Sequence, residues 1–210
     1  MNNRFLKIDE LARPDHWYLE AEDECYYIGE YTARGGHACS ETNQLIHNFK
    51  KGVERRGRPE WAYKERAIGT IANMIRANIK NDAVLTFVPI PPSKAKDHEL
   101  YDERMSRVLA FASAGRPSNV RELIIQIRSV EATHVSNARP TPDEVLQNYQ
   151  LDEALCLPEP QLIFLVDDVL TTGCHFKAAK RLLSARFPNV SIMGLFVARR
   201  VPKSDFDALD

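Results

Sequence analysis

Residues 162–175 read Leu-Ile-Phe-Leu-Val-Asp-Asp-Val-Leu-Thr-Thr-Gly-Cys-His, and this stretch decides the fold class. The apolar run over 162–166 is typical of a strand buried in a parallel sheet. Two carboxylates, Asp167 and Asp168, end that run. A loop of small residues over 171–173 comes next, and a helical pattern follows it. A buried strand that leads through a loop into a helix indicates an α/β fold.

The rest of the chain supplies the other strands and helices of such a fold. Strands are expected over 83–90, 123–127 and 190–198, and helices over 40–49, 61–79, 101–113 and from residue 174. We therefore predict an open, mainly parallel sheet flanked by helices. Because the carboxyl ends of parallel strands share one edge, the loops after Ile90, Ile127 and Val166 should meet there.

The N-terminal part has a different pattern. Residues 16–32 are rich in aromatic side chains and partly alternate, which predicts one or two antiparallel strands closed by a turn. We expect the chain to divide into an N-terminal part with a connecting helix, residues 1–58, and an α/β core, residues 59–210.

Size and composition are those of a globular protein. The 210 residues, 44% of them hydrophobic, suit one domain or one domain with a small elaboration. A net charge of −1 gives no overall attraction to nucleic acid or to an anionic membrane. No apolar stretch approaches the length of a membrane span, and the N-terminus lacks a signal-peptide core. We therefore expect a cytoplasmic protein with no membrane partner.

One cluster of basic residues interrupts this neutral average. It consists of Lys50, Lys51, Arg55, Arg56 and Arg58. The pattern is typical of a solvated helix end and loop, and it is also compatible with a local patch for an anionic partner.

The four cysteines form no CxxC pair, which favours free thiols in a reducing compartment. Cys25, His37 and Cys39 could approach one another across a hairpin. Zinc needs a fourth ligand, and none follows at suitable spacing, so a zinc site is not favoured.

The loop over 171–173 has the features of a phosphate-binding loop. A strand that leads into a helix N-terminus presents unpaired backbone N–H groups, and the helix dipole adds positive potential. Thr171 and Thr172 add hydroxyl donors, and Gly173 lets the backbone approach a ligand closely. Asp167 and Asp168 are acceptors suited to sugar hydroxyls, which makes a sugar phosphate the expected ligand. Acidic strand ends without a site are also common, and receiver domains carry an acidic pair on their first strand.

The same string resembles the PRPP-binding motif of type I phosphoribosyltransferases, in which two acidic residues precede a hydrophobic pair and a Thr-Thr-Gly-like loop. The resemblance implies that Asp167 and Asp168 hold the ribose hydroxyls and act in catalysis chiefly by orienting the ribose. It implies that the 5-phosphate is bound by Thr171, Thr172, Gly173, Cys174 and His175. The implied cofactor is Mg²⁺, held through the ligand with the two aspartates nearest to it.

His175 departs from the family pattern, which usually has a small hydroxylic residue at that position. Its backbone N–H can still donate to a phosphate. The imidazole could change affinity or pH dependence, act as a general acid or base, or point away from the site.

A second motif ends the strand expected over 83–90, where residues 87–94 read Phe-Val-Pro-Ile-Pro-Pro-Ser-Lys. It resembles the ComF-related branch of the family, without the zinc-ribbon cysteines that often precede this domain in ComF proteins. The resemblance implies that Ser93 and Lys94 bind pyrophosphate and that Arg104 closes on it as a second clamp. The prolines and Lys94 also suit a solvated turn. Arg128 is either a site residue or a structural ion-pair partner.

The resemblance further implies that residues 16–50 form a hood over the second substrate. Its aromatic side chains either stack on a nucleobase or form the core of the hood. They are Trp17, Tyr18, Tyr26, Tyr27 and Tyr31.

The function that follows from the resemblance is glycosyl transfer. The protein would bind PRPP or a nucleoside 5′-monophosphate and transfer the phosphoribosyl group to or from a nitrogenous base, with pyrophosphate as co-product. Two alternatives stay open: a catalytically silent PRPP- or nucleotide-binding regulator, and a partner subunit in a DNA-processing or defence system, which would have a nucleic-acid or protein partner. A homodimer would follow from the family only by analogy.

Overall fold

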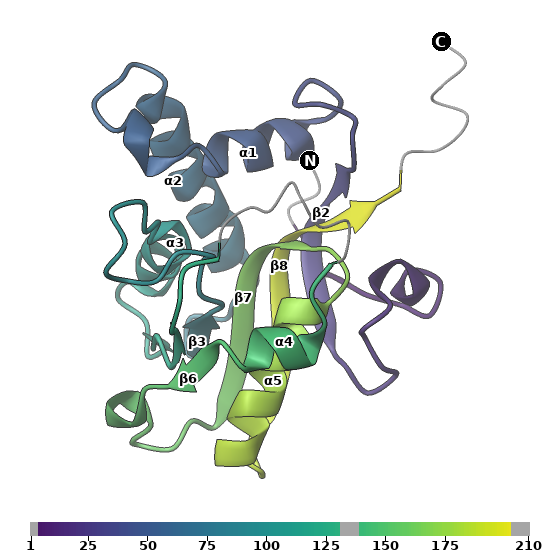
Figure 1. Ribbon diagram of the computed structural model, residues 1–210, viewed down its shortest axis with the longest axis vertical. Helices are drawn as coiled ribbons and strands as arrows, with labels where there is room; N and C mark the ends of the chain where they lie inside the picture. The colour runs from purple at the N-terminus through teal and green to yellow at the C-terminus, as the bar shows by residue number, and fades with distance from the viewer. Residues whose placement is uncertain (1–3, 131–138, 203–210) are drawn as a thin grey trace.

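The computed structural model describes residues 4–130 and 139–202 and contains one six-stranded sheet at its centre (Figure 1). The strand order is β1 (Leu6–Lys7), β2 (Cys25–Thr32), β8 (Ser191–Val201), β7 (Leu162–Leu170), β3 (Thr86–Pro89) and β4 (Asn119–Val120). Every neighbouring pair is parallel except β1 and β2. The predicted α/β fold with a mainly parallel sheet flanked by helices is confirmed.

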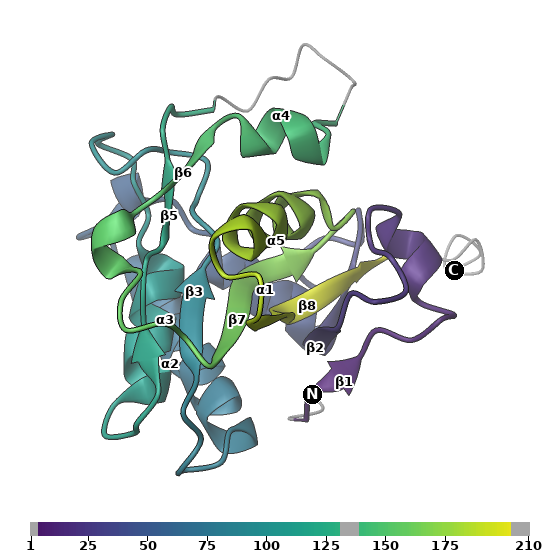
Figure 2. The ribbon, with the colours of Figure 1, turned by 90° about the horizontal axis from the view of Figure 1, so that it is seen from below.

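Helices cover both faces of the sheet. The helices are α1 (Glu41–Phe49), α2 (Trp61–Asn78), α3 (Arg104–Ser113), α4 (Pro142–Leu146) and α5 (Cys174–Arg186), with short 3₁₀ turns at Arg13–His16, Val53–Arg55 and Glu153–Leu155. One apolar cluster joins α1, α2 and α3 to the sheet, and a second joins α5 to its other face. Figure 2 shows α4 and α5 on one side of β7 and β8, and α2 and α3 on the other. The predicted helices at α1, α2, α3 and α5 are confirmed.

The motif strand explains why its sequence is apolar without alternation. Leu165 belongs to the cluster under α5, and its neighbour Val166 belongs to the cluster under α1, α2 and α3. Successive side chains of a strand point to opposite faces, so a strand covered on both faces needs apolar residues throughout.

This strand is longer than predicted. The apolar run was expected to end at Val166, but β7 continues through both aspartates to Leu170, which pairs with Arg199 of β8. The cause is β8, which extends as far and supplies hydrogen-bond partners to the polar residues. Asp167 and Asp168 are therefore strand residues with opposite orientations rather than parts of a loop.

The strand expected over 123–127 is present, but it is not part of the main sheet, so its predicted place in the parallel sheet was wrong. Residues Ile124–Gln126 form β5, which pairs antiparallel with β6 (Tyr149–Leu151) in a separate two-stranded sheet. The fifth parallel position is taken by β4, a two-residue strand. An apolar run of three residues does not specify its pairing partner, and a two-residue strand leaves no periodic pattern.

The antiparallel strands expected over 16–32 were also wrong in part. That region holds one strand, β2, which runs parallel to β8 from Cys25 opposite Gly194 onward. Its antiparallel partner is β1, which lies outside the expected range. The division between residues 58 and 59 stays a prediction.

Three further findings concern the cysteines, metal ligands and membrane spans. All four cysteines are free, with Cys39 exposed and the other three buried. Within residues 4–130 and 139–202, no three His, Cys, Asp or Glu side chains gather as metal ligands. No helix in these ranges is long and apolar enough to cross a membrane.

Candidate functional site

The loop between β7 and α5 turns at a glycine that no other residue can replace without strain. Gly173 is the N-cap of α5 and has a φ of +84° in the left-handed region. A Cβ built on it would lie 2.9 Å from Cδ2 of Leu19. Glycine alone combines that φ with no side chain. The close approach in the structure is to Leu19, and the predicted approach of a ligand to Gly173 stays a prediction.

The N-terminal segment holds the carbonyl groups of this loop. The backbone N–H of Tyr18 donates to the carbonyl of Thr172 over 3.0 Å. The ring Nδ1 of His16 bonds to the carbonyl of Thr171 and must be the donor there, because a carbonyl only accepts. The other ring nitrogen, Nε2, is buried and bonds to no described residue. Burial lowers the pKa of His16, which favours this neutral form.

The backbone N–H groups of the loop are left for a ligand. Within the described parts of the chain, no group accepts a hydrogen bond from the N–H of Thr171, Thr172 or Gly173. The N–H of Cys174 reaches Oγ1 of Thr172 at 3.3 Å. With its carbonyls held on one side, the loop presents donors on the other, which suits an anion at the start of α5.

A cavity of about 440 Å³ adjoins this loop. The loop side of its wall consists of Thr171, Thr172, Cys174 and His175. Facing them are three arginines, Arg34, Arg139 and Arg200, and none of the described wall residues is acidic. Guanidinium groups and open N–H groups around one space favour a phosphate or another anion.

Asp168 is buried on the other face of β7 and is held by two cations. Its carboxylate oxygens lie 2.9 Å from Nζ of Lys50 and 2.8 Å from Nη2 of Arg104. Arg104 also pairs with Asp102 at 2.8 Å, and Asp102 pairs with the buried Lys64 at 2.6 Å. Burial opposes ionisation of Asp168, but Lys50 and Arg104 outweigh it and lower its pKa.

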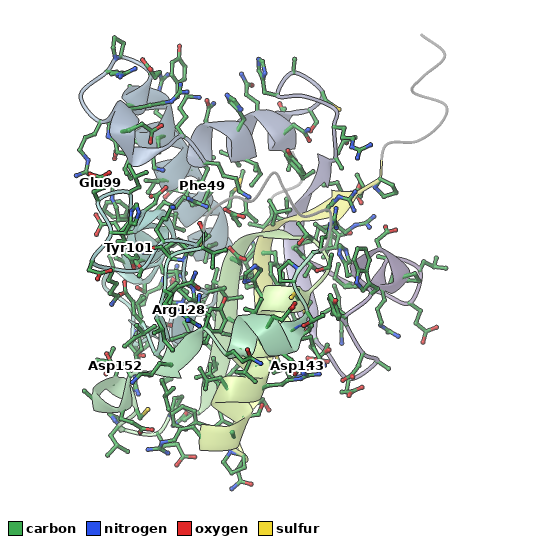
Figure 3. The ribbon with its side chains drawn as sticks, viewed as in Figure 1. Phe49, Glu99, Tyr101, Arg128, Asp143 and Asp152 are labelled. Atoms are coloured by element: carbon green, nitrogen blue, oxygen red, sulfur yellow. The ribbon has the colours of Figure 1, made fainter. Side chains whose placement is uncertain are left out.

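The guanidinium of Arg104 is fixed from a third direction by an aromatic ring. It lies 5.4 Å from the ring centroid of Phe49, the last residue of α1, which is labelled in Figure 3. Stacking and two ion pairs leave Arg104 little freedom to move. The residue predicted as a phosphate clamp is therefore preorganised beside the acidic pair.

Asp167 has the opposite protonation behaviour. Burial and the charge of Asp168 raise the pKa of Asp167 to about 7, against the opposing influence of Lys50. Its Oδ1 accepts the backbone N–H of Asp168 at 2.7 Å. Two adjacent carboxylates with different pKa values can act differently. Asp168 stays an anion, whereas Asp167 can donate or accept a proton near neutral pH.

Compared with known protein families and with curated proteins, the chain matches none. The interpretation of the site rests on its geometry.

His175 is engaged by a tyrosine. The hydroxyl of Tyr149 lies 3.0 Å from Nδ1 of His175. Burial, and then the charge of Asp167, raises the pKa of Tyr149, so the hydroxyl keeps its proton, and the tautomer of His175 sets which of the two groups donates. Desolvation lowers the pKa of His175, although Asp168 opposes this. His175 therefore lines the cavity beside the loop over 171–173 as a neutral ring whose orientation is fixed by Tyr149.

The residues predicted to bind pyrophosphate are only partly brought together. Arg104 contacts Asp168 directly. Lys94 borders a narrow cavity that Asp102, the other partner of Arg104, also lines. The carbonyl of Ser93 accepts from the backbone N–H of Val130 at 2.8 Å and from Nε2 of Gln126 at 2.9 Å. No contact between Ser93 or Lys94 and the acidic pair is seen in the described residues.

Arg128 lies at the end of the small sheet and has an exposed side chain, which Figure 3 labels. Its backbone N–H donates to Oδ1 of Asn148 at 2.9 Å, and its carbonyl accepts from Nδ2 of the same residue at 2.8 Å. The side-chain amide of Asn148 thus bonds both backbone groups of Arg128 and extends the β5–β6 pair.

Sequence reasoning missed several residues of this site. Lys50 was assigned only to a basic cluster, and His16 and Arg200 were assigned to nothing. Each reaches the motif from a distant part of the chain, so no local spacing indicates the contact. The N-terminal position of His16, one residue before Trp17, carries no signal for a bond to the loop at Thr171.

We expect Gly173→Ala to destabilise the protein more than Gly57→Ala does. Gly57 has nearly the same φ, +83°, but an added Cβ would meet nothing within 4 Å. Gly57→Ala should therefore cost about 1–2 kcal/mol for the left-handed backbone alone. Gly173→Ala adds the contact with Leu19 to that cost. Urea denaturation of both variants measures the difference, and equal losses would contradict the close approach at Leu19.

We expect Asp167→Asn to stabilise the protein at alkaline pH. The pKa of Asp167 is raised to about 7 in the fold. Its contribution to stability is therefore present below the unfolded-state pKa and is lost as the pH rises through the folded-state value. Without the carboxylate, the free energy of unfolding should exceed that of wild type near pH 8, by up to about 4 kcal/mol, and approach it near pH 4.

Denaturant titrations at the two pH values test this expectation, with the exposed Asp82→Asn as the control for loss of one carboxylate. A gain in the free energy of unfolding that is the same at both pH values would show that ionisation of Asp167 does not destabilise the fold.

Proposed function

We propose that this protein binds a phosphorylated ribose, PRPP or a nucleoside 5′-monophosphate, together with Mg²⁺. It would transfer the phosphoribosyl group to or from a nitrogenous base, with pyrophosphate as co-product. The observation that carries the proposal is the combination on one strand end of an open N–H loop at Thr171–Gly173 and the acidic pair at Asp167 and Asp168. We further propose that the α/β fold is that of the type I phosphoribosyltransferases and that the protein works in the cytoplasm.

The 5-phosphate is assigned to the loop side of the site. Three backbone N–H groups, the hydroxyls of Thr171 and Thr172 and the N-terminus of α5 supply donors. The arginines across the cavity supply a second layer of positive charge. A phosphate dianion would satisfy donors that the described protein leaves without acceptors.

The ribose hydroxyls are assigned to the acidic pair. Oδ1 of Asp167 is used by a backbone N–H, and its second oxygen has no bond to a described residue. Both oxygens of Asp168 accept from cations, but a carboxylate has about four lone-pair directions and can accept further hydrogen bonds. Because the two side chains have opposite orientations, we assign one ribose hydroxyl to each of them.

The transfer itself would exchange two bonds at C1 of the ribose. A ring nitrogen of the base forms a bond to C1 with its lone pair, the bond from C1 to pyrophosphate oxygen breaks, and pyrophosphate leaves with those electrons. The ring N–H proton passes to solvent. The ionised Asp168 places negative potential near the positive charge that develops on the ribose, and Arg104 and Lys94 are the cations assigned to the leaving group.

The donor set fits Mg²⁺ only as an ion that arrives with the ligand. Within the described residues, no cluster of three metal-ligating side chains is present, and of the acidic pair only Asp167 has a carboxylate oxygen that bonds to no described residue. Mg²⁺ is commonly held by one or two carboxylates plus substrate phosphates and waters. When bound, it would neutralise charge on the leaving pyrophosphate.

A catalytically silent binder is the second candidate, and one observation favours it. Asp168 is engaged by two cations, and the position of the usual small hydroxylic residue is taken by His175, whose ring is fixed by Tyr149. A site that binds the sugar phosphate without turning over would keep these contacts. Pyrophosphate release in the presence of a base distinguishes the two candidates.

We expect PRPP to bind with Mg²⁺ dependence and Asp168→Asn to lower its affinity at least tenfold. The substitution removes the charge that positions Lys50 and Arg104 as well as an acceptor for the ribose. Isothermal titration calorimetry with and without Mg²⁺ measures both effects, and circular dichroism confirms that the variant is folded.

Thr171→Val is the companion variant, because Thr171 is exposed and its hydroxyl can be removed without disturbing the core. It should weaken ribose 5-phosphate several-fold. Unchanged affinity in both folded variants would refute the site assignment.

We expect Lys94→Ala to weaken pyrophosphate binding more than ribose 5-phosphate binding, since Lys94 is assigned to the leaving group. Lys80→Ala is the control for loss of one lysine, because Lys80 is exposed and lies outside the cavity that Lys94 borders. Competition binding with each anion gives the comparison. Equal losses of the two ligands in Lys94→Ala would remove Lys94 from its proposed role.

A further inference from the structure

A second cavity, of about 460 Å³, lies on the α1 side of the acidic pair. It is formed by the end of β2, the connection to α1, the exposed face of α1 and the segment that follows it. Figure 1 shows the connection to α1 and the start of α1 beside the upper end of β2, and the segment that follows α1 at the other end of that helix. Tyr31 lines both this cavity and the cavity beside the loop over 171–173. Lys50 lines the second cavity and also contacts Asp168. The cavity is thus adjacent to the proposed ribose position.

The wall of this second cavity is positively charged. Its charged residues are Lys50, Lys51 and Arg55, against a single acid, Glu54. Desolvation, and then the charges of Lys51, His37 and Arg55, lower the pKa of His47. The groups around His47 therefore oppose a further positive charge there, and a negative charge would be favoured.

The same wall presents planar rings. The rings of His37 and His47 have centroids 5.1 Å apart and are tilted by 31°. Tyr31 stands on the β2 side of the cavity. Stacked or tilted rings favour a flat ligand, and a space of this size holds a small heterocycle with water.

From the cationic wall, the ring pair and the contact of Lys50 with Asp168, we propose that this cavity binds a flat heterocycle that carries a carboxylate. This rests on the proposed function and names the substrate class: the base that accepts or leaves the phosphoribosyl group is an anion. A neutral base would gain nothing from the positive charges of Lys51 and Arg55 at the cavity wall. A nucleic acid strand is the less favoured occupant, because Arg55 lies between Glu54 and Glu60, at 3.7 and 3.8 Å, rather than on an uninterrupted basic surface.

Two matched pairs of small molecules test this inference: nicotinate against nicotinamide, and orotate against uracil. Calorimetry of the full chain, with and without ribose 5-phosphate, should give at least tenfold tighter binding of the carboxylate in the better-bound pair. Arg55→Gln should remove most of that preference. Arg58→Gln changes the same charge on the same segment but outside the cavity wall and should preserve it.

The position of the bound anion is read from His47 by proton NMR. A carboxylate in this cavity should raise the pKa of His47, because it offsets the charges of Lys51 and Arg55 that lower it. The neutral member of the pair should leave that pKa unchanged.

The inference would be overturned by equal affinity for the charged and neutral members, by a carboxylate preference that survives Arg55→Gln, or by binding only of a single-stranded oligonucleotide. No affinity for either carboxylate in a protein that binds ribose 5-phosphate would also overturn it. Failure of the proposed function would appear separately, as loss of ribose 5-phosphate binding, while the carboxylate preference measured without the sugar phosphate decides this inference alone.

Discussion

The buried charge of Asp168 is the constraint on which the arrangement of the helices depends. A carboxylate inside a sheet covered on both faces is costly to desolvate and is tolerated only when it is paired and hydrogen-bonded. Lys50, directly after α1, and Arg104, the first residue of α3, supply the pairing charges. Breaking such a buried pair costs about 3–5 kcal/mol. The ends of two helices are therefore fixed relative to β7 by one strand residue.

The loop that follows β7 depends on the N-terminal segment in a similar way. Its carbonyls are held by His16 and Tyr18, and its turn at Gly173 packs against Leu19. A loop with free N–H groups needs its carbonyls satisfied elsewhere, since buried backbone groups are rarely left unpaired. His16, Tyr18 and Leu19 thus shape the loop, although they do not line the cavity beside it.

The sequence predicted the parts of this protein that are local. The apolar run before Asp167, the small residues to Gly173 and the amphipathic α5 lie in one continuous stretch, and their pattern fixed both the α/β class and the centre of the site. Strand pairing was less predictable, because β4 has two residues and β5 has three, too few to define a period or a partner. The ion pairs of Lys50 and the bond of His16 are set by tertiary packing across long sequence separations, and no spacing rule contains them.

The distribution of charge around β7 argues for a ligand with negative groups at separate positions. Arginines and open N–H groups surround the cavity on one side of Tyr31, and lysines with Arg55 surround the cavity on the other. Between them stand two aspartates, one kept ionised by cations and one with a pKa near 7. A uniformly cationic site would hold any polyanion, whereas carboxylates placed between two cationic regions repel one that is charged along its whole length. The ligand proposed above, a ribose between a phosphate and an anionic base, would meet the two cationic regions with its charged ends and the aspartates with its neutral, hydroxyl-bearing middle.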